Sequence, residues 1–71
     1  MTTDRATVDA RLAEVLRDER GRLTGALVRI LGDWDLAEEL VQDAAVSALE
    51  HWAVDGIPRN PGAWLMTAAR R

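Results

Sequence analysis

The sequence contains no cysteine, no lysine, no phenylalanine and no tyrosine, and its one histidine is His51. Without cysteine the chain can form neither a disulfide nor a thiolate metal site, and a single histidine makes a histidine-based metal site implausible. There is no apolar run long enough to cross a membrane and no secretory h-region at the N-terminus. We therefore expect a cytoplasmic protein without cofactor, metal or membrane contact, since lack of cysteine also suits a reducing compartment.

The 71 residues carry a net charge of -3, and every basic residue is an arginine. An acidic chain of this kind is not an electrostatic DNA binder by its overall charge. A domain of this size buries only about 60% of its unfolded surface, so its core is small. The aromatic residues are three tryptophans, which we expect to supply much of the packing volume: Trp34, Trp52 and Trp64.

Apolar spacing predicts a first helix from Thr7, as its cap, to about Leu31, after a frayed segment from Met1 to Ala6. Glu19 interrupts the apolar stripe, which then resumes in phase. A bend near Glu19 to Gly21 is the alternative to one straight helix, because glycine weakens a helix interior. The predicted inward stripe consists of Val8, Leu12, Val15, Leu16, Leu23, Leu27, Ile30 and Leu31.

Gly32 is suited to end the first helix in the left-handed conformation. The turn that follows is short, so the next helix should pack antiparallel to the first. We predict this second helix over Asp35–Trp52, with Asp35 as its N-cap and Glu38 completing a capping box.

The second helix has an apolar side and an acidic side, and Val46 and Leu49 fall among the acids. Two branched apolar residues in an acidic stripe suggest a face that docks on a basic partner helix. Scattered exposed apolar residues are also ordinary, and helix geometry alone does not choose between the two readings. The predicted inward side is Leu36, Ala37, Leu40, Val41, Ala44, Ala48 and Trp52.

The segment Ala53–Asn60 contains Asp-Gly and Ile-Pro and predicts a loop. Asn60 should cap a third helix with Pro61 at its first position, although its side chain could also bind a ligand. Trp64, Leu65 and Ala68 form the expected inward stripe of that helix, and the chain stops at two arginines without a helix stop signal. The sequence therefore predicts a small all-α fold of three helices, a long antiparallel hairpin and a shorter third helix, truncated at its C-terminus.

Catalysis has little support in the sequence. Ser47 and Thr67 have no evident base, and we interpret His51 as a packed or surface residue rather than a catalytic one. No glycine-rich phosphate loop is present. We therefore predict that the chain is not an enzyme.

Three segments of the sequence stand out together: Asp35-Leu-Ala-Glu-Glu-Leu-Val-Gln-Asp-Ala44, Ala48-Leu-Glu-His-Trp52 and Asp55-Gly-Ile-Pro-Arg-Asn-Pro-Gly-Ala-Trp-Leu-Met-Thr-Ala-Ala-Arg70. These segments resemble region 2 of bacterial sigma factors, and most closely the extracytoplasmic-function class of the sigma-70 family. The resemblance covers roughly residues 23–71, and the run from Pro58 to Leu65 is its most specific part. It implies an all-helical domain of a protein that directs RNA polymerase to promoters.

The resemblance also implies two sites. One docks on the clamp helices of the RNA polymerase β′ subunit, at Glu39, Gln42, Asp43, Ala45, Val46 and Leu49. The other captures a flipped base of the promoter −10 element with a specificity loop, Val54 to Asn60, and the helix after it. Its DNA-binding positions here are Gly56, Ile57, Pro58, Arg59, Asn60, Thr67, Arg70 and Arg71. An anti-sigma factor is a further partner that the resemblance allows. Trp64 could stack on a base, but we expect it in the core.

Two departures from the family limit these expectations. The basic helix that usually continues past the final arginines is missing, and so is a second domain for the −35 element. We therefore expect residues 1–71 to form one region 2-like domain that binds DNA weakly by itself. The alternative function is a helical protein–protein interaction module or regulator without DNA binding.

Overall fold

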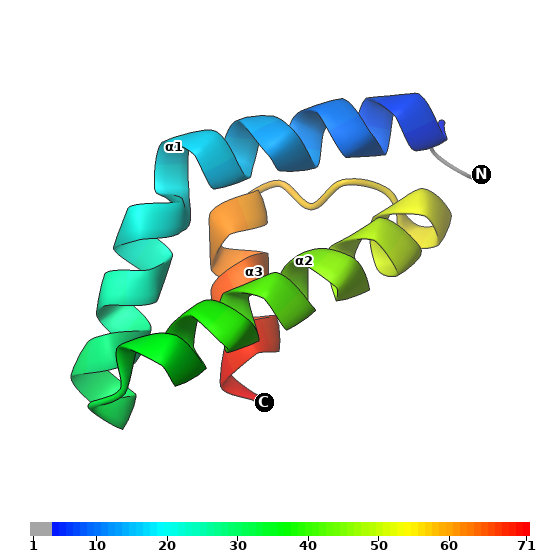
Figure 1. Cartoon of the computed structure of the whole chain (residues 1–71). Helices are drawn as coiled ribbons and strands as arrows, with labels where there is room; N and C mark the ends of the chain where they lie inside the picture. The colour runs from blue at the N-terminus through cyan, green and yellow to red at the C-terminus, as the bar shows by residue number, and fades with distance from the viewer. Residues whose placement is uncertain (1–3) are drawn as a thin grey trace.

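A computed structural model describes residues 4–71, which form three α-helices: α1 (Arg5–Leu31), α2 (Trp34–Asp55) and α3 (Pro61–Arg70). α2 runs back in the direction from which α1 came, and α3 lies in the angle between them (Figure 1). The predicted all-α fold, with a long hairpin and a shorter third helix, is confirmed. None of these helices is both long enough and apolar enough to span a membrane.

α1 begins three residues earlier than predicted, because its N-cap is Asp4 rather than Thr7. Asp4 occupies the N-cap position without a side-chain hydrogen bond, and its carbonyl oxygen accepts from the N–H of Val8 at 3.0 Å. The expectation of a frayed segment up to Ala6 is therefore wrong for Arg5 and Ala6, which are helical. Met1–Thr3 lie outside the described residues.

α1 is one continuous helix, as predicted, but it changes direction sharply in its middle, in the cyan part of Figure 1. Sharp bends in helices occur where a glycine, a proline or an inserted group weakens the backbone ladder. Gly21 lies in this part of α1 and is exposed, and a methyl group added to it would touch nothing. The bend lets both halves of α1 face the interior. The buried residues of α1 are Val8, Leu12, Val15, Leu23, Thr24 and Leu27.

The prediction that Ile30 and Leu31 point into the core is wrong. Their exposed fractions are 55% and 40%. They belong to the last turn of α1 and follow Leu27, the last buried residue of the helix, by three and four residues. Together with Trp34, exposed at 53%, they leave apolar surface around the turn between α1 and α2.

The turn between the first two helices ends α1 as predicted but starts α2 differently. Gly32 has a φ of 70° and donates its N–H to the carbonyl oxygen of Val28 at 2.7 Å, the expected left-handed stop. The N-cap of α2 is Asp33, whose carboxylate accepts from the N–H of Leu36 at 3.0 Å. The predicted cap, Asp35, lies instead inside the first helical turn.

Removing the Asp33 cap should destabilise the domain measurably. We expect Asp33→Ala to lower the free energy of unfolding by about 1 kcal/mol, because one N–H at the start of α2 loses its acceptor. Asp35→Ala is the matched control and should cost about 0.5 kcal/mol, because Asp35 contributes only to the helix dipole. Urea unfolding followed by circular dichroism measures both. A larger loss for the Asp35 variant would contradict the assigned cap.

α2 continues to Asp55, one turn beyond the predicted end at Trp52, so the loop is Gly56–Asn60 rather than Ala53–Asn60. Gly56 ends the helix with a φ of 92° and donates its N–H to the carbonyl oxygen of Trp52 at 3.0 Å. The predicted inward side of α2 is buried except for Leu40, which is half-buried, and Leu36, which is 39% exposed near the start of the helix.

α3 begins as predicted. The side-chain oxygen of Asn60 accepts from the N–H of Ala63 at 3.1 Å, and Pro61 is the first helical residue. Leu65 and Ala69 are the buried side chains that attach α3 to the core, whereas Trp64 and Ala68, predicted inward, are half-buried. The buried apolar core comprises Val8, Leu12, Val15, Leu23, Leu27, Ala37, Val41, Ala44, Ala48, Trp52, Leu65 and Ala69.

Candidate functional site

The outer side of α2 carries the six residues that sequence analysis assigned to docking, and we call this surface the docking face. Val46 lies within it with 54% of its side chain exposed, although it is a branched apolar residue in the middle of a helix. Glu39, Asp43 and Gln42 are also exposed. Of the two branched apolar residues predicted among the acids, Val46 is exposed there, whereas Leu49 is half-buried.

Leu49 and Ala45 differ from the other members of the docking face. Leu49 is half-buried and packs against the core, as does Ala45. Each of them is therefore covered in part by the core and exposed in part on the docking face. The exposed apolar centre of the face is thus Val46, with Leu49 at its edge.

Gln42 connects the docking face to α1. The Arg20 guanidinium donates a hydrogen bond to the Gln42 side-chain oxygen at 3.0 Å. Arg20 therefore borders the face on the α1 side and holds the amide of Gln42 in one orientation, leaving its two N–H donors available.

Charges are segregated along the chain. α2 contains six of the twelve carboxylates, Asp35, Glu38, Glu39, Asp43, Glu50 and Asp55, and no arginine. The segment 56–71, which contains the loop and α3, has three arginines, Arg59, Arg70 and Arg71, and no carboxylate side chain. One side of this acidic domain therefore suits a basic partner, while the other suits an anion.

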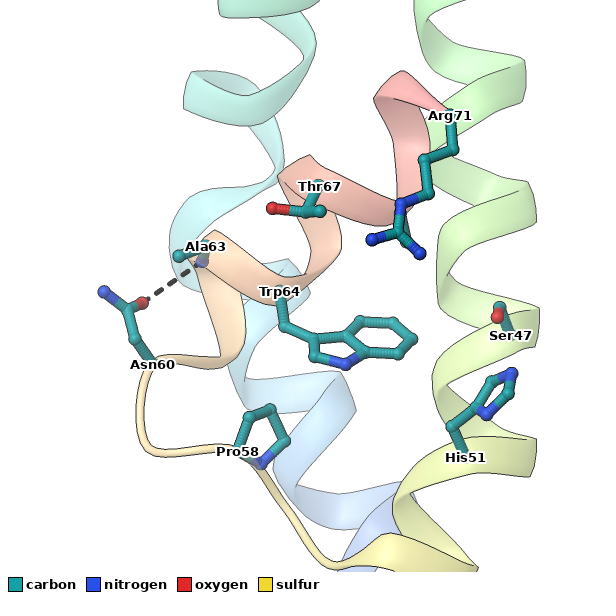
Figure 2. Close-up of a pocket in the computed structure, with 9 residues that line it drawn as sticks. Ser47, His51, Pro58, Asn60, Ala63, Trp64, Thr67 and Arg71 are labelled. Carbon is teal, nitrogen blue, oxygen red and sulfur yellow. Dashed lines mark hydrogen bonds between the residues drawn. The ribbon is translucent and has the colours of Figure 1, made fainter.

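A cleft of about 670 Å³ lies between α2 and α3. In Figure 2 the Trp64 indole reaches from α3 toward Ser47 and His51 of α2, and the Arg71 guanidinium points toward the same ring. Pro58 closes the lower end in this view. Ser47, His51, Pro58, Asn60, Ala63, Trp64, Thr67, Ala68 and Arg71 line the cleft.

Trp64 forms the aromatic wall of the cleft and rests on the core. Its ring meets Trp52 edge-on, with centroids 5.5 Å apart and planes at 73°, the arrangement that aromatic quadrupoles favour. His51 lies on its other side at 6.0 Å. Since Trp52 is buried and Trp64 only half-buried, Trp64 presents part of its surface to the cleft.

The structure brings together four of the eight predicted DNA-binding residues: Pro58, Asn60, Thr67 and Arg71 all line the cleft. Arg70 lies elsewhere, in a small groove with Leu27 and Ile30. Gly56 and Ile57 are half-buried, and Ile57 packs against the core, whereas Arg59 is exposed.

Sequence reasoning missed four lining residues, Ser47, His51, Ala63 and Ala68, and it named Trp64 as a possible stacking residue but favoured the core for it. Helical spacing did contain part of the signal, since Ser47 and His51 are four residues apart on α2, and Trp64 and Ala68 are four apart on α3. It could not show that these two stripes face each other. Within residues 4–71, no group of histidine, aspartate or glutamate side chains is arranged to hold a metal ion.

Comparison with known proteins identifies the family. Residues 15–71 match the family described as Sigma-70 region 2. The chain is also 40% identical over 68 residues to a protein of Rhizobium meliloti (strain 1021) described as "Uncharacterized protein R00370". That match covers 96% of the chain but spans only 15% of the length of this relative. No solved structure matches significantly.

The chain therefore belongs to the Sigma-70 region 2 family. This is a domain family of sigma factors, which act in transcription initiation and are transcription factors rather than enzymes. The predicted family is confirmed at this level. Its assignment to the extracytoplasmic-function class stays a prediction.

Proposed function

We propose that this chain is the region 2 domain of an extracytoplasmic-function sigma factor. In this proposal the docking face binds the clamp helices of the RNA polymerase β′ subunit, and the α2–α3 cleft helps to recognise and melt the promoter −10 element. Residues 1–71 form one domain that acts in the cytoplasm, where polymerase and promoter meet. An anti-sigma factor that covered the docking face would block the first of these two activities.

The observation that carries the docking proposal is the exposure of Val46 among carboxylates. An apolar side chain exposed at 54% gains about 1 kcal/mol or more when a partner covers it. The carboxylates around it, Glu39, Asp43 and Glu50, attract a basic partner and speed its association. α2 carries six carboxylates and no arginine, so it favours a partner helix that presents basic residues.

The cleft supports the DNA part of the proposal by its chemistry. Its volume of about 670 Å³ lies in the range of small-molecule sites, so one unstacked base fits. Trp64 offers an aromatic surface on which a base can stack. Asn60, Thr67 and Arg71 supply polar groups for a base edge and a phosphate.

Docking can be tested by titrating the 71-residue chain into a labelled β′ clamp-helix fragment and following fluorescence anisotropy. We expect saturable 1:1 binding that weakens as salt is raised, because carboxylates of α2 contribute to the attraction. Absence of binding at low salt would overturn the docking proposal. Binding of the clamp fragment without any recognition of promoter DNA would favour the interaction-module alternative.

The chain alone should bind single-stranded DNA weakly, and its affinity should fall only modestly as the salt concentration rises. Only Arg59, Arg70 and Arg71 are available on the loop and α3, so the slope of log K against log salt should be about −2. Arg71→Ala should reduce that slope by about 0.7, whereas Arg11→Ala, on α1, is the control and should leave it unchanged. Filter binding of a −10 oligonucleotide at several salt concentrations measures it. Tight binding at physiological salt would contradict the charge argument.

A further inference from the structure

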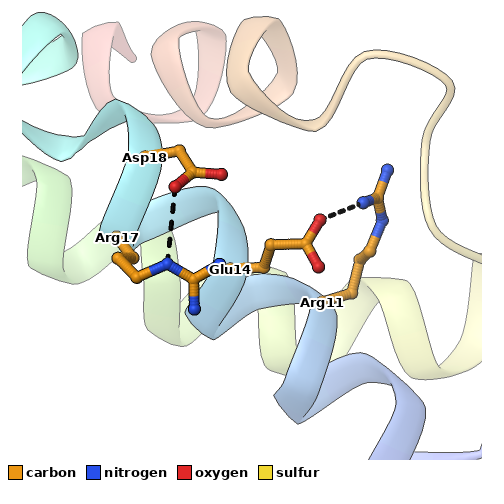
Figure 3. A network of polar contacts seen from close by, with 4 residues as sticks. All are labelled: Arg11, Glu14, Arg17 and Asp18. Carbon is orange, nitrogen blue, oxygen red and sulfur yellow. Dashed lines mark hydrogen bonds and ion pairs between the residues drawn. The ribbon is translucent and has the colours of Figure 1, made fainter.

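Glu19 differs from every other charged residue in residues 4–71, because it alone is not exposed. Its side chain is 31% accessible, whereas the ion pairs Arg11–Glu14 and Arg17–Asp18 of the same helix lie in solvent (Figure 3). A partly buried carboxylate is costly unless a positive group compensates it. Glu19 also interrupts the apolar stripe of α1, so its position has no explanation in core packing.

The Glu19 carboxylate lies against Gly62, the second residue of α3. A methyl group placed on Gly62 would come within 3.0 Å of the Glu19 Cδ and 3.1 Å of its Oε2, and closer still to Oε1. Gly62 is buried and has no left-handed backbone conformation. A side chain at position 62 would therefore push the Glu19 carboxylate out of this contact, whereas the backbone conformation itself does not require glycine.

This contact places a negative charge at the positive end of α3. Pro61 has no N–H, the Ala63 N–H donates to the side-chain oxygen of Asn60, and the Trp64 N–H donates to the Asn60 carbonyl oxygen. The Gly62 N–H is the remaining donor of the first turn, where the partial positive charge of a helix is concentrated. Arg22 lies 3.6 Å from the Glu19 Oε1 and balances the rest of its charge.

Resting on the proposed function, we propose that Glu19 is a positioning residue for the α2–α3 cleft. α3 is ten residues long and joins α2 through the short loop Gly56–Asn60. The Glu19–Gly62 contact holds the start of α3 against the bend of α1. It thereby sets where Asn60 and Trp64, which flank Gly62 in sequence, stand relative to His51 across the cleft.

A double-mutant cycle tests the contact itself. In the native background, Gly62→Ala should lower the urea midpoint of unfolding, because the new methyl group displaces the Glu19 carboxylate. In a Glu19→Ala background the same Gly62→Ala change should raise the midpoint, since alanine is the better helix former and the Glu19 carboxylate no longer stands in its way. Effects of the same sign in both backgrounds would overturn the proposal.

Positioning of the cleft is tested with Glu19→Gln, which keeps the size of the side chain. We expect amide NMR shifts concentrated at 58–64 and at the Trp64 indole, with little change at 39–50. Affinity for a random-sequence single-stranded DNA 10-mer at low salt should fall about two- to tenfold, and affinity for the clamp fragment should not change. The matched control, Asp18→Asn, removes the same charge from an exposed neighbour and should alter neither.

The outcomes separate the two proposals. Shifts spread over the whole chain, or equal losses of DNA and clamp binding, would reduce Glu19 to a general stabilising residue and overturn its positioning role. If the native chain binds no single-stranded DNA, the DNA part of the proposed function fails. Two measurements then still decide whether Glu19 positions α3. One is the opposite effect of Gly62→Ala on the urea midpoint in the two backgrounds, and the other is the location of the amide NMR shifts caused by Glu19→Gln.

Discussion

Val46→Arg should weaken binding to the β′ clamp-helix fragment by about 30-fold or more. The substitution removes the exposed apolar centre of the docking face. It also places a positive charge opposite a partner that we expect to be basic, because α2 carries six carboxylates and no arginine. Loss of a central apolar contact at an interface costs about 2 kcal/mol or more, and like-charge repulsion adds to it. Fluorescence anisotropy of the labelled fragment measures the change.

The chain offers a matched control for this variant on the same helix. Val54 is 64% exposed on α2 but lies outside the docking face. Val54→Arg adds the same side chain and the same charge, so it should change clamp affinity by no more than about twofold. Circular dichroism should show unchanged helix content for both variants, because neither valine is buried. Equal loss of binding in the two would mean that the partner responds to total charge and not to this face.

Trp52→Ala should lower the free energy of unfolding of the domain by about 3–5 kcal/mol. Trp52 is 1% exposed and has the largest side chain among the fully buried residues. Its ring also packs against the ring of Trp64. Replacing a buried tryptophan by alanine costs about 3–5 kcal/mol. A domain of this length has a total stability of roughly 4–10 kcal/mol, so the substitution would remove a large part of it. Far-ultraviolet circular dichroism and urea unfolding measure the loss.

Trp34→Ala is the control for the loss of Trp52, because it removes the same side chain from a site that is 53% exposed. We expect it to change the free energy of unfolding by about 0.5 kcal/mol or less. A native-like unfolding midpoint for Trp52→Ala would contradict the assigned core. The Nε1 atom of Trp52 is buried without a hydrogen-bond partner among the described residues, so its burial is stabilised by packing alone.

α2 connects the two proposed activities. Its outer side forms the docking face, its inner side supplies much of the core including Trp52, and the side between them lines the cleft with Ser47 and His51. When the docking face binds its partner through Val46, the cleft is therefore held at a fixed distance from that partner, because both surfaces belong to the same helix. This arrangement explains why the acidic and basic surfaces lie on different elements of so small a domain.

Local sequence signals predicted the elements well. The stop at Gly32 and the start of α3 at Asn60-Pro61 depend only on the conformation of one residue or on contacts within one turn, and both were found where expected. The cap of α2 was misassigned because Asp33 and Asp35 have equal capping chemistry. Which of them caps depends on where the chain leaves Gly32, and that direction is set by the packing of α2 on α1.

The sequence by itself determined three helices, most of their inward residues, the exposed valine on the acidic face of α2 and the resemblance that leads to the family. These follow from helical periodicity, which is a property of neighbouring residues. Only the tertiary structure decided that α1 bends, that Ile30 and Leu31 are exposed, and that Ser47 and His51 face Trp64. The contact of Glu19 with Gly62 belongs to the same group. Each of these depends on how helices distant in sequence pack together, and periodicity within one helix contains no information about that packing.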